Sequence, residues 1–345
     1  MKDKTNISVV WIDDESQDRT VDAKNIVFKR KKLHIQVFHP KDNKIDDLIV
    51  KLKPDKRIPD LFLVDYFLDQ RAEQQTKEKF EARALTIAGR IREKLPEHPI
   101  YVVTNYPAKK EGVFISEAQA ANIIFDKLLS LKEVQRYGHD ILYFDALDYA
   151  RIRNSKRNSL EALYSLLEAP ECAYSIIESV LPDELKKGIS PLGNTISFAN
   201  WVHNVLAIKP GILYDDIYTA TYLGMAVQYL RSIDEKIIKA VYRGIFSTTN
   251  PRRLWWRCAI NDILFSSKKA KSSNKTNPWE LGPIVFNVPK KYLAKCVVCG
   301  HPYPETVGTN IKDDSDIKPV HFKCSLPHPL KKRDLYFDEF RAFSL

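Results

Sequence analysis

The segment Ile7-Ser8-Val9-Val10-Trp11-Ile12-Asp13-Asp14 does more than any other stretch of this 345-residue chain to decide its fold. Five of its first six residues are apolar. A short apolar run of this kind predicts a strand that is buried on both faces, as strands of parallel sheets are. Two aspartates follow directly, so the carboxyl end of this strand carries two carboxylates.

Four similar runs follow within the first 130 residues and alternate with helical patterns. The expected strands are Ile7–Ile12, Leu33–Phe38, Leu61–Val64, Ile100–Val103 and Asn122–Phe125. The expected helices are Asp18–Lys31, Lys44–Leu52, Gln74–Lys94, Ile115–Ala121 and Leu129–Tyr137. Strands interleaved with helices predict an α/β fold with a parallel sheet covered on both faces.

Polar residues stand where four of these strands end. Asp13 and Asp14 follow the first strand, Asp65 the third, Thr104 the fourth and Lys127 the fifth. Open parallel sheets bind ligands outside the carboxyl ends of their strands. We therefore expect these five side chains to converge in one pocket.

The chemistry of such a pocket follows from its charges. Three carboxylates repel one another unless a cation lies among them. Oxygen ligands suit Mg²⁺, which would also neutralise charge as a phosphoryl group passes to Asp65. Thr104 would hydrogen-bond a phosphate oxygen, and Lys127 would pair with it.

The five residues, in this order, resemble the receiver domain of two-component response regulators over residues 1–140. The resemblance implies a doubly wound, flavodoxin-like sheet of strand order 2-1-3-4-5. It implies Mg²⁺ held by Asp13, Asp14 and Asp65. It also implies phosphorylation of Asp65 by a histidine kinase or a phosphotransfer protein, with Thr104 and Lys127 binding the phosphate.

Two features depart from the family pattern. Receivers usually carry a proline and a glycine soon after the acceptor, whereas Tyr66–Gln70 contains neither and the charged stretch Arg71–Arg83 follows. The usual aromatic switch residue of strand five has only Phe125 as a candidate. A receiver-like domain that is not phosphorylated and serves as a protein-interaction scaffold therefore remains an alternative.

Composition changes along the chain predict four parts. The receiver would span 1–140, a polar linker 141–158, an α-helical output region 159–278 and a small C-terminal module 279–345. Within the output region, Leu160, Leu163, Leu166 and Leu167 recur at helical spacing, and Ser266–Pro278 is rich in Ser and Lys and predicts a flexible segment.

Three of the five cysteines cluster near the C-terminus. Cys296, Cys299, His321 and Cys324 form two pairs with the spacing of a closed, structural Zn²⁺ site. His301 and His328 are rivals for the histidine position, and three reduced cysteines without metal are the plain alternative. The five cysteines are too few and too unevenly placed for a disulfide scaffold.

The net charge of +10 is concentrated in one region. Residues 236–295 contain thirteen Lys or Arg against two acids, Asp262 and Glu280. Asn250-Pro251 predicts the start of a helix over Arg252–Leu264, and arginines in a first helical turn favour a bound anion. The candidate nucleic-acid ligands, for DNA or RNA, are Arg252, Arg253, Arg257, Lys268, Lys269 and Lys271. An acidic protein partner and a plain solvated face are the alternatives.

The remaining expectations concern class and location. No run approaches the ~20 apolar residues of a membrane helix, and the start of the chain does not resemble a secretory signal, so a cytoplasmic protein without a membrane partner is expected. A homodimer regulated by phosphorylation is one expected output. The sequence predicts no enzyme beyond the receiver chemistry; a receiver-gated enzyme acting on nucleic acid through Asp215 and Asp216 is the alternative.

Overall fold

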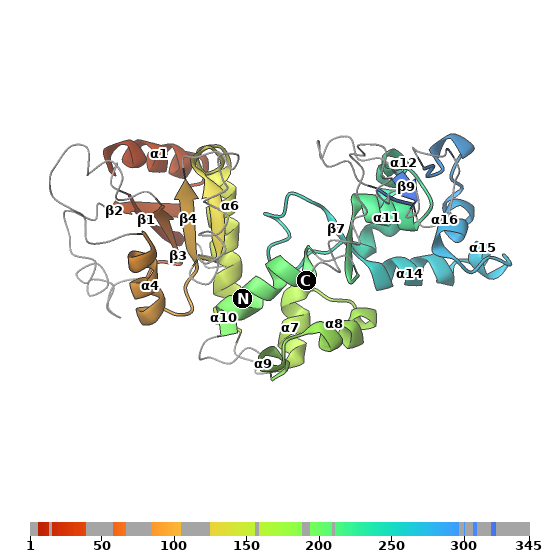
Figure 1. Ribbon diagram of the computed structural model, residues 1–345, viewed down its shortest axis with the longest axis horizontal. Coiled ribbons are helices and arrows are strands. Elements are labelled where there is room, and N and C mark those ends of the chain that lie inside the picture. Colours follow the sequence, from red (N-terminus) through yellow and green to blue (C-terminus); the bar gives the residue numbers. More distant parts are fainter. Residues whose placement is uncertain are drawn as a thin grey trace, which may run out of the picture. The chain divides into compact units, whose positions relative to one another are not determined.

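The computed structural model describes residues 6–13, 16–38, 58–66, 84–104, 125–155, 159–187, 194–208, 211–296 and 300, and the backbone of 306–308 and 319–321. The chain divides into two compact units (Figure 1). Unit 1 comprises Met1–Ala162 and Asp183–Asn200, and unit 2 comprises Leu163–Pro182 and Trp201–Leu345. The chain therefore passes between the units three times, at 162/163, 182/183 and 200/201.

Unit 1 is an α/β structure. Its described strands are β1 (Ile7–Ile12), β2 (Leu33–Phe38), β3 (Leu61–Asp65), β4 (Ile100–Thr104) and β5 (Lys127–Ser130). Its described helices are α1 (Ser16–Lys29), α4 (Ala84–Lys94), α6 (Leu131–Arg153), α9 (Asp183–Lys186) and α10 (Asn194–Trp201). All neighbouring strands pair in parallel, in the order β2-β1-β3-β4-β5. This order is that of the flavodoxin-like doubly wound sheet, so the predicted fold class is confirmed for this part of the chain.

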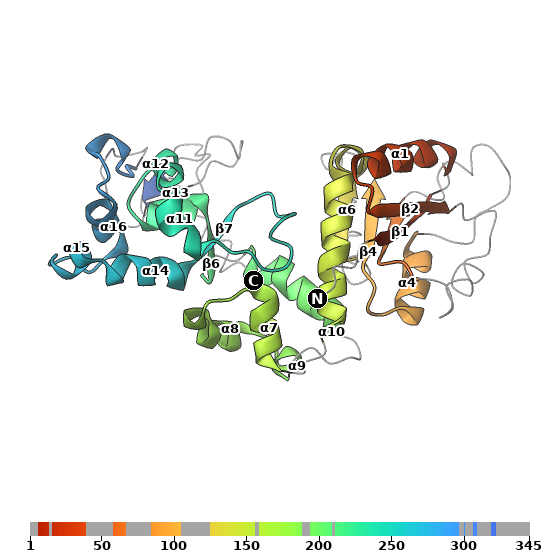
Figure 2. The same cartoon turned by 180° about the vertical axis from the view of Figure 1, so that it is seen from behind.

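Helices cover both faces of the sheet, as apolar strands require. On one face, α4 packs against a cluster that includes Val10 and Ile12 of β1 and Phe62 and Val64 of β3. On the other face lie α1 and α6, which pack against each other (Figures 1 and 2). Successive strand residues alternate between these two faces, which explains the nearly unbroken apolar runs in the sequence.

The fifth strand lies later in the chain than the predicted Asn122–Phe125. Residues 122–124 lie outside the described residues, Phe125 is not in a strand, and β5 begins at Lys127. β5 is an edge strand in which Leu129 is buried but Leu128 is exposed. It therefore lacks the apolar run that marks the four other strands, and the prediction of its position is wrong.

Helix α6 begins with a capping box at Ser130. The Ser130 side chain accepts a hydrogen bond from the Glu133 N–H, and the Glu133 side chain accepts one from the Ser130 N–H. The helix then runs for 23 residues to Arg153 and buries Leu142, Ala146 and Tyr149. Residues 141–153 of the predicted linker are therefore helical, because they carry a buried apolar face.

Unit 2 is mainly helical. It includes the C-terminal part of α7 (Leu160–Leu167), then η2 (Glu171–Ala173), α8 (Tyr174–Val180), the π-helical η3 (Val202–Leu206), α11 (Asp216–Tyr222), α12 (Val227–Ser232), α13 (Asp234–Ile237), η4 (Ile238–Ala240), α14 (Arg257–Ser266), α15 (Lys268–Lys271), α16 (Pro278–Phe286) and η5 (Lys290–Tyr292). Two antiparallel strand pairs join β6 (Leu213–Asp215) to β7 (Leu254–Trp256), and β8 (Thr306–Gly308) to β9 (Pro319–His321). The predicted helical character of this region is consistent with these elements.

Two local predictions for unit 2 are wrong. The predicted helix Arg252–Leu264 starts five residues late, because Leu254–Trp256 forms β7 and pairs with β6. Asn250 does not cap a helix; its side chain accepts a hydrogen bond from the Arg252 N–H at 2.9 Å, which forms a turn. The predicted flexible segment 266–278 contains α15 and the start of α16, and Ala270 anchors it by packing into the core.

Two glycines allow helices α11 and α16 to approach at backbone distance. A Cβ at Gly282 of α16 would lie 2.1 Å from the Leu223 carbonyl oxygen, and a Cβ at Gly224 would lie 2.1 Å from the Trp279 carbonyl oxygen. Gly224 also has a φ of +65°, in the left-handed region that glycine tolerates best. The contact is reciprocal, so each glycine is needed for the other segment to fit.

A disulfide joins Cys172 of η2 to Cys258 of α14, 86 residues apart in the sequence. The two cysteines lie in different segments of unit 2, one on each side of the residues that unit 1 takes from the chain. Sequence reasoning gave no reason to pair them, because nothing in their spacing distinguishes them from buried thiols.

Candidate functional site

Three of the predicted pocket residues lie at the carboxyl edge of three adjacent strands. Ile12 of β1 pairs with Val64 of β3, so Asp13 and Asp65 follow on neighbouring strands. Asp65 in turn pairs with Val103 of β4, and Thr104 is the next residue. Asp13 and Thr104 are buried, and Asp65 is half-buried. The structure therefore brings together Asp13, Asp65 and Thr104, while Asp14 lies outside the described residues.

An arginine that sequence reasoning missed contacts this acidic edge. Arg19 of α1 donates from Nε to Asp13 Oδ2 at 3.1 Å and from Nη1 to Asp22 Oδ2 at 2.6 Å. Its guanidinium lies 5.8 Å from the centroid of the Trp11 ring. Burial opposes its charge, but the carboxylates of Asp22 and Asp13 outweigh that effect and raise its pKa. A basic residue about one turn into the helix that follows an acidic pair is the signal that could have revealed it.

Lys127 does not lie at this edge, and the prediction that it joins the pocket is wrong. β5 begins at Lys127, which pairs with Tyr101, whereas Ser130 is the residue that pairs with Thr104. Three residues of strand separate Lys127 from the carboxyl edge, a rise of about 10 Å. The position opposite Thr104 belongs to Ser130, whose hydroxyl caps α6. The predicted fifth strand ends at Phe125, whereas β5 ends at Ser130. This error in the strand boundary is the reason why Lys127 was wrongly expected at the carboxyl edge.

The Lys127 ammonium instead completes a polar network beneath α6. Its Nζ lies 2.8 Å from Asp145 Oδ2, and the Tyr101 hydroxyl donates to the same oxygen at 2.7 Å. Asp145 has no exposed side-chain surface. Tyr149 packs beside Tyr101, with ring centroids 6.4 Å apart. The network joins α6 to β4 and β5, which indicates a structural role for Lys127.

Burial raises the pKa of Tyr101 and of Tyr149 well above the ordinary value of 10.0. The unfolded chain therefore loses these phenolic protons first as the pH rises, and folding stability is lost above pH 10. We expect the free energy of unfolding to fall by ~1.4 kcal/mol per pH unit for each such tyrosine in that range.

Urea titrations between pH 9 and pH 11 would measure this slope. Tyr149→Phe should make it shallower by ~1.4 kcal/mol per pH unit. Tyr137→Phe, at an exposed position of the same helix, is the matched control and should keep the wild-type slope. Equal slopes in wild type and Tyr149→Phe would contradict the assignment.

The predicted zinc ligands lie mostly outside the described residues. Cys299 and Cys324 belong to that part, and only the backbone of His321 is described, at the end of β9. Cys296 is buried. Among the described residues, no three His, Cys, Asp or Glu side chains gather in a way that could hold a metal ion.

The predicted arginine site is held by acidic neighbours within unit 2. Arg253 donates to Asp216 Oδ1 at 3.0 Å and to Asp234, and its guanidinium lies 4.5 Å from the Trp255 ring centroid. Arg252 lies 3.6 Å from Asp215. Three carboxylates therefore pair with these arginines, and the interpretation of Arg252 and Arg253 as nucleic-acid ligands stays a prediction.

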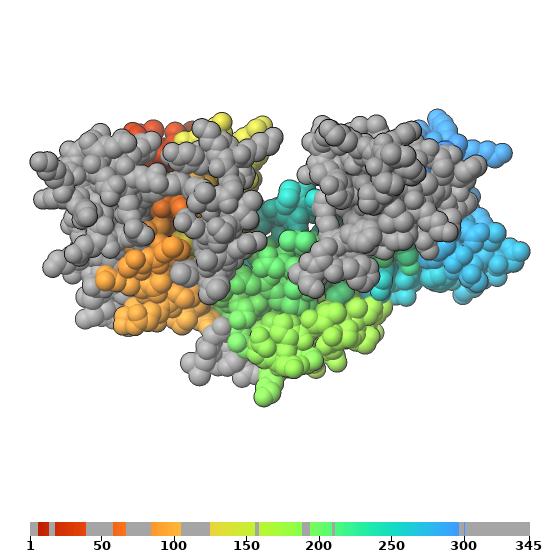
Figure 3. Space-filling model, viewed as in Figure 1, coloured from red at the N-terminus to blue at the C-terminus, as the bar shows by residue number. Residues whose placement is uncertain are grey.

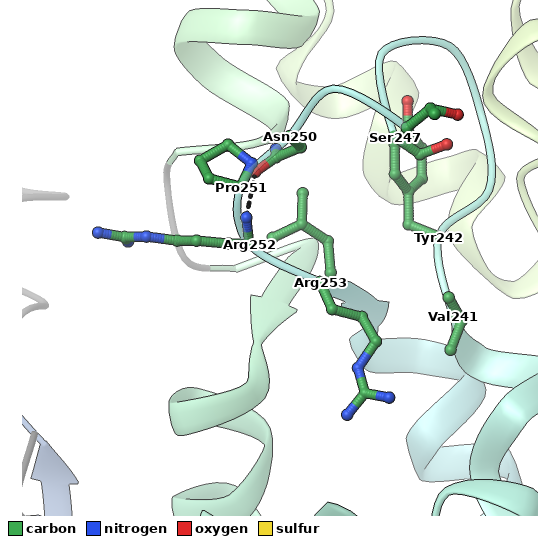
Figure 4. A pocket seen from close by; sticks show the side chains of 9 residues that line it. Val241, Tyr242, Ser247, Asn250, Pro251, Arg252 and Arg253 are labelled. Atoms are coloured by element: carbon green, nitrogen blue, oxygen red, sulfur yellow. Dashed lines mark hydrogen bonds between the residues drawn. The ribbon is translucent and has the colours of Figure 1, made fainter. Parts of the chain in front are cut away.

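The pocket beside these arginines has a volume of about 430 Å³ and lies between the 247–254 loop and Val241-Tyr242 (Figure 4). Figure 4 shows Arg252 and Arg253 extending from the loop in different directions. Trp255 and Trp256 are fully buried, so they cannot stack on bases. Arg257 lies 5.9 Å from the Tyr214 ring centroid, where it packs against an aromatic side chain.

The two aspartates of the alternative enzyme also have structural roles. Asp215 caps α11 by accepting from the N–H groups of Ile217 and Tyr218, each at 2.9 Å. Asp216 accepts from the Trp255 indole at 2.8 Å as well as from Arg253. Their carboxylates are thus occupied in holding β6, α11 and β7 together, and this favours no catalytic role.

Among the described residues, none of the helices is long and apolar enough to cross a bilayer. No protein-family model matches the sequence, and no curated protein does. Solved structures of response regulator receiver domains resemble the N-terminal part of the chain. One from Methanospirillum hungatei is 10% identical, with a TM-score of 0.31, and the match covers 42% of this chain and 98% of that one.

Two further receivers are similar at the same level. The putative regulator NarL of Mycobacterium tuberculosis is 14% identical, with a TM-score of 0.29, and covers 41% of this chain and 96% of its own. NtrX of Brucella abortus is 16% identical, with a TM-score of 0.29, and covers 41% and 98%. Because these identities and TM-scores are low, the doubly wound fold is assigned from the strand order of unit 1.

Proposed function

We propose that unit 1 is a receiver-type signalling module in which Asp65 accepts a phosphoryl group. The observation that carries this proposal is the placement of Asp13, Asp65 and Thr104 at the ends of three adjacent parallel strands. Ligands of doubly wound sheets bind at this edge. A histidine kinase or a phosphotransfer protein is the class of donor that the proposal requires.

The transfer itself is a displacement at phosphorus. A carboxylate oxygen of Asp65 attacks the phosphoryl group of a phosphohistidine; the new O–P bond forms as the N–P bond breaks, and the imidazole leaves with the electron pair. The Thr104 hydroxyl donates a hydrogen bond to a phosphoryl oxygen. Asp13 and Asp65 offer the carboxylate oxygens that Mg²⁺ prefers, with Asp14 as the third ligand expected from the sequence. When bound, the ion neutralises charge on the transferring group.

Two basic residues differ from the expected arrangement. Lys127 takes no part in this proposal, because its ammonium is bound by Asp145. Arg19 lies against Asp13 and supplies a fixed positive charge at the acidic edge. That charge lowers the repulsion between Asp13 and Asp65 before any phosphoryl group arrives.

The proposal is tested by labelling the full chain with a phosphohistidine or acyl phosphate donor in the presence of Mg²⁺. We expect wild type to be labelled and Asp65→Asn to lose labelling completely, because the nucleophilic oxygen pair is gone. Lys127→Met should retain most of the labelling, provided circular dichroism shows that it is folded. Phos-tag electrophoresis or mass spectrometry reports the modified fraction.

The outcomes separate two candidate functions. Labelling of Asp65→Asn at the wild-type level would refute Asp65 as the acceptor. A wild-type protein that is never labelled would favour the second candidate, a constitutive protein-interaction scaffold, which the displaced Lys127 supports. Loss of labelling in folded Lys127→Met would contradict the structural role given to that lysine.

The C-terminal module completes the proposed signalling protein. We infer that Cys296, Cys299, His321 and Cys324 hold a structural Zn²⁺, since the first pair precedes β8 and the second begins at the last residue of β9. Phosphorylation of Asp65 would then control unit 2 or dimerisation, by biasing the surface next to Thr104 between two arrangements.

A further inference from the structure

Five exposed lysines of unit 2 come from two short helices. Lys268, Lys269 and Lys271 belong to α15, and Lys290 and Lys291 belong to η5. We call these five residues the lysine surface. Figures 1 and 2 show α15 beyond the end of α14 and next to α16, in both views. In the space-filling view, atoms of the segment from α14 to α16 lie at the surface on the right, in light blue and blue (Figure 3).

One hydrogen bond joins α15 to the residue that ends α16. Lys269 Nζ lies 2.6 Å from Asn287 Oδ1. Asn287 ends α16 in the left-handed conformation, with a φ of 56°, and η5 begins three residues later at Lys290. Asn287 therefore connects α15 to the turn that leads to η5. The two segments together carry five exposed lysines of unit 2.

Two tyrosines lie within this basic surface. The Tyr229 hydroxyl donates to the carbonyl oxygens of Phe286 and Asn287, each at 3.0 Å. Its ring centroid lies 5.4 Å from that of Tyr292, and Lys291 Nζ lies 4.8 Å from the centroid of the Tyr292 ring. Both tyrosines are partly exposed, unlike the buried Trp255 and Trp256.

Among the described residues, no acidic side chain pairs with the lysines of this surface. Glu280 is the one acid in the sequence between residues 263 and 295, and Lys275 binds it at 2.7 Å. Within the part of the chain that the structure describes, the five lysines form no ion pair, and Lys269 contacts a neutral amide. Arg253 differs from these lysines, because its guanidinium contacts two carboxylates.

We propose that the lysine surface of unit 2 binds single-stranded nucleic acid. The lysines contact successive phosphates, and unstacked bases pack on Tyr229 and Tyr292. Basic surfaces with accessible aromatic rings suit single strands, because every base offers a π-face and the phosphate spacing needs no base readout. Charge alone would suit an acidic polypeptide equally, and the tyrosines are what favours nucleic acid. The proposal does not depend on phosphorylation of Asp65.

The test is a fluorescence-polarisation titration of the full chain with a labelled oligothymidylate of about 20 nucleotides, longer than the ~4–16 nucleotides that one small binding fold covers. Wild type should bind, with an affinity that falls as salt rises. Lys268→Glu with Lys290→Glu should weaken binding at least about tenfold and reduce the salt slope by about 1.4, from ~0.7 for each lost phosphate contact. Tyr292→Leu should weaken binding about fivefold or more through lost stacking.

The matched control is Lys31→Glu with Lys32→Glu, two exposed lysines in the turn before β2 of unit 1. This pair makes the same change in net charge outside the lysine surface, so it should keep affinity within about twofold of wild type, as a phosphate-contact origin of binding requires. An equal loss in both double variants would overturn the proposal. The proposal would also be overturned if wild type did not bind, or if Tyr292→Leu bound with the same affinity as wild type. Displacement of the oligonucleotide by poly-glutamate at equal charge concentration would overturn it as well.

Discussion

Replacing Gly282 with alanine is expected to destabilise unit 2 by about 3 kcal/mol or more, the upper range for overpacking a rigid site. The new Cβ would lie 2.1 Å from the Leu223 carbonyl oxygen, which is backbone and cannot swing aside. Helices α11 and α16 would have to separate, and the core cluster around Leu223 and Leu281 would open.

Urea denaturation followed by tryptophan fluorescence measures this effect, because four of the five tryptophans belong to unit 2. Gly89→Ala in α4 is the control, since a Cβ there meets no atom within 4 Å. It should leave stability unchanged or raise it by up to ~1 kcal/mol through helix propensity. A Gly282→Ala protein with the wild-type midpoint would show that the backbone contact does not exist.

Replacing Asp145 with alanine is expected to destabilise unit 1 by about 3 kcal/mol, near the lower end for breaking a buried ion pair. The substitution leaves the Tyr101 hydroxyl buried without its acceptor and removes the partner of Lys127. The lower end applies because the Lys127 side chain retains 26% exposure and can reach water.

Circular dichroism during urea denaturation would report the shift, and the fluorescence transition of unit 2 should stay where it is. Asp183→Ala serves as the control, because Asp183 pairs with Lys186 at an exposed site and its loss should leave the midpoint unchanged. If Asp145→Ala and Asp183→Ala behaved alike, Lys127 would not be held as described, and its exclusion from the acidic edge would lose its physical basis.

The acidic edge could be predicted because it depends on strands with strong apolar runs. Once β1, β3 and β4 are recognised, the ends of parallel strands must meet, and Asp13, Asp65 and Thr104 follow from that rule alone. The prediction that Lys127 lies at this edge was wrong because β5 is a short edge strand with one buried residue. The hydrophobic pattern therefore did not fix the register of this strand.

The arginines of unit 2 illustrate a different limit. Sequence reasoning counted Arg252 and Arg253 as unbalanced because no acid lies near them in the chain. Their partners Asp215, Asp216 and Asp234 come from positions 19 to 37 residues away. Asp215 and Asp216 arrive through the pairing of β6 with β7, and Asp234 arrives from α13. Local charge counts cannot reveal such partners, whereas the lysines of α15 and η5 form no ion pair among the described residues.

Because the chain passes between the units three times, each unit is built from two separate segments of the sequence, and this limits which fragments can fold. A fragment ending at residue 162 would lack α9 and α10, including Thr195, whose N–H donates to Glu97 at 3.2 Å. A fragment beginning at residue 201 would lose Cys172 and the Leu167 backbone that packs against Gly244. Neither unit can be excised by a single cut, so circular permutation or a short linker replacing 183–200 is the route to an isolated unit 2.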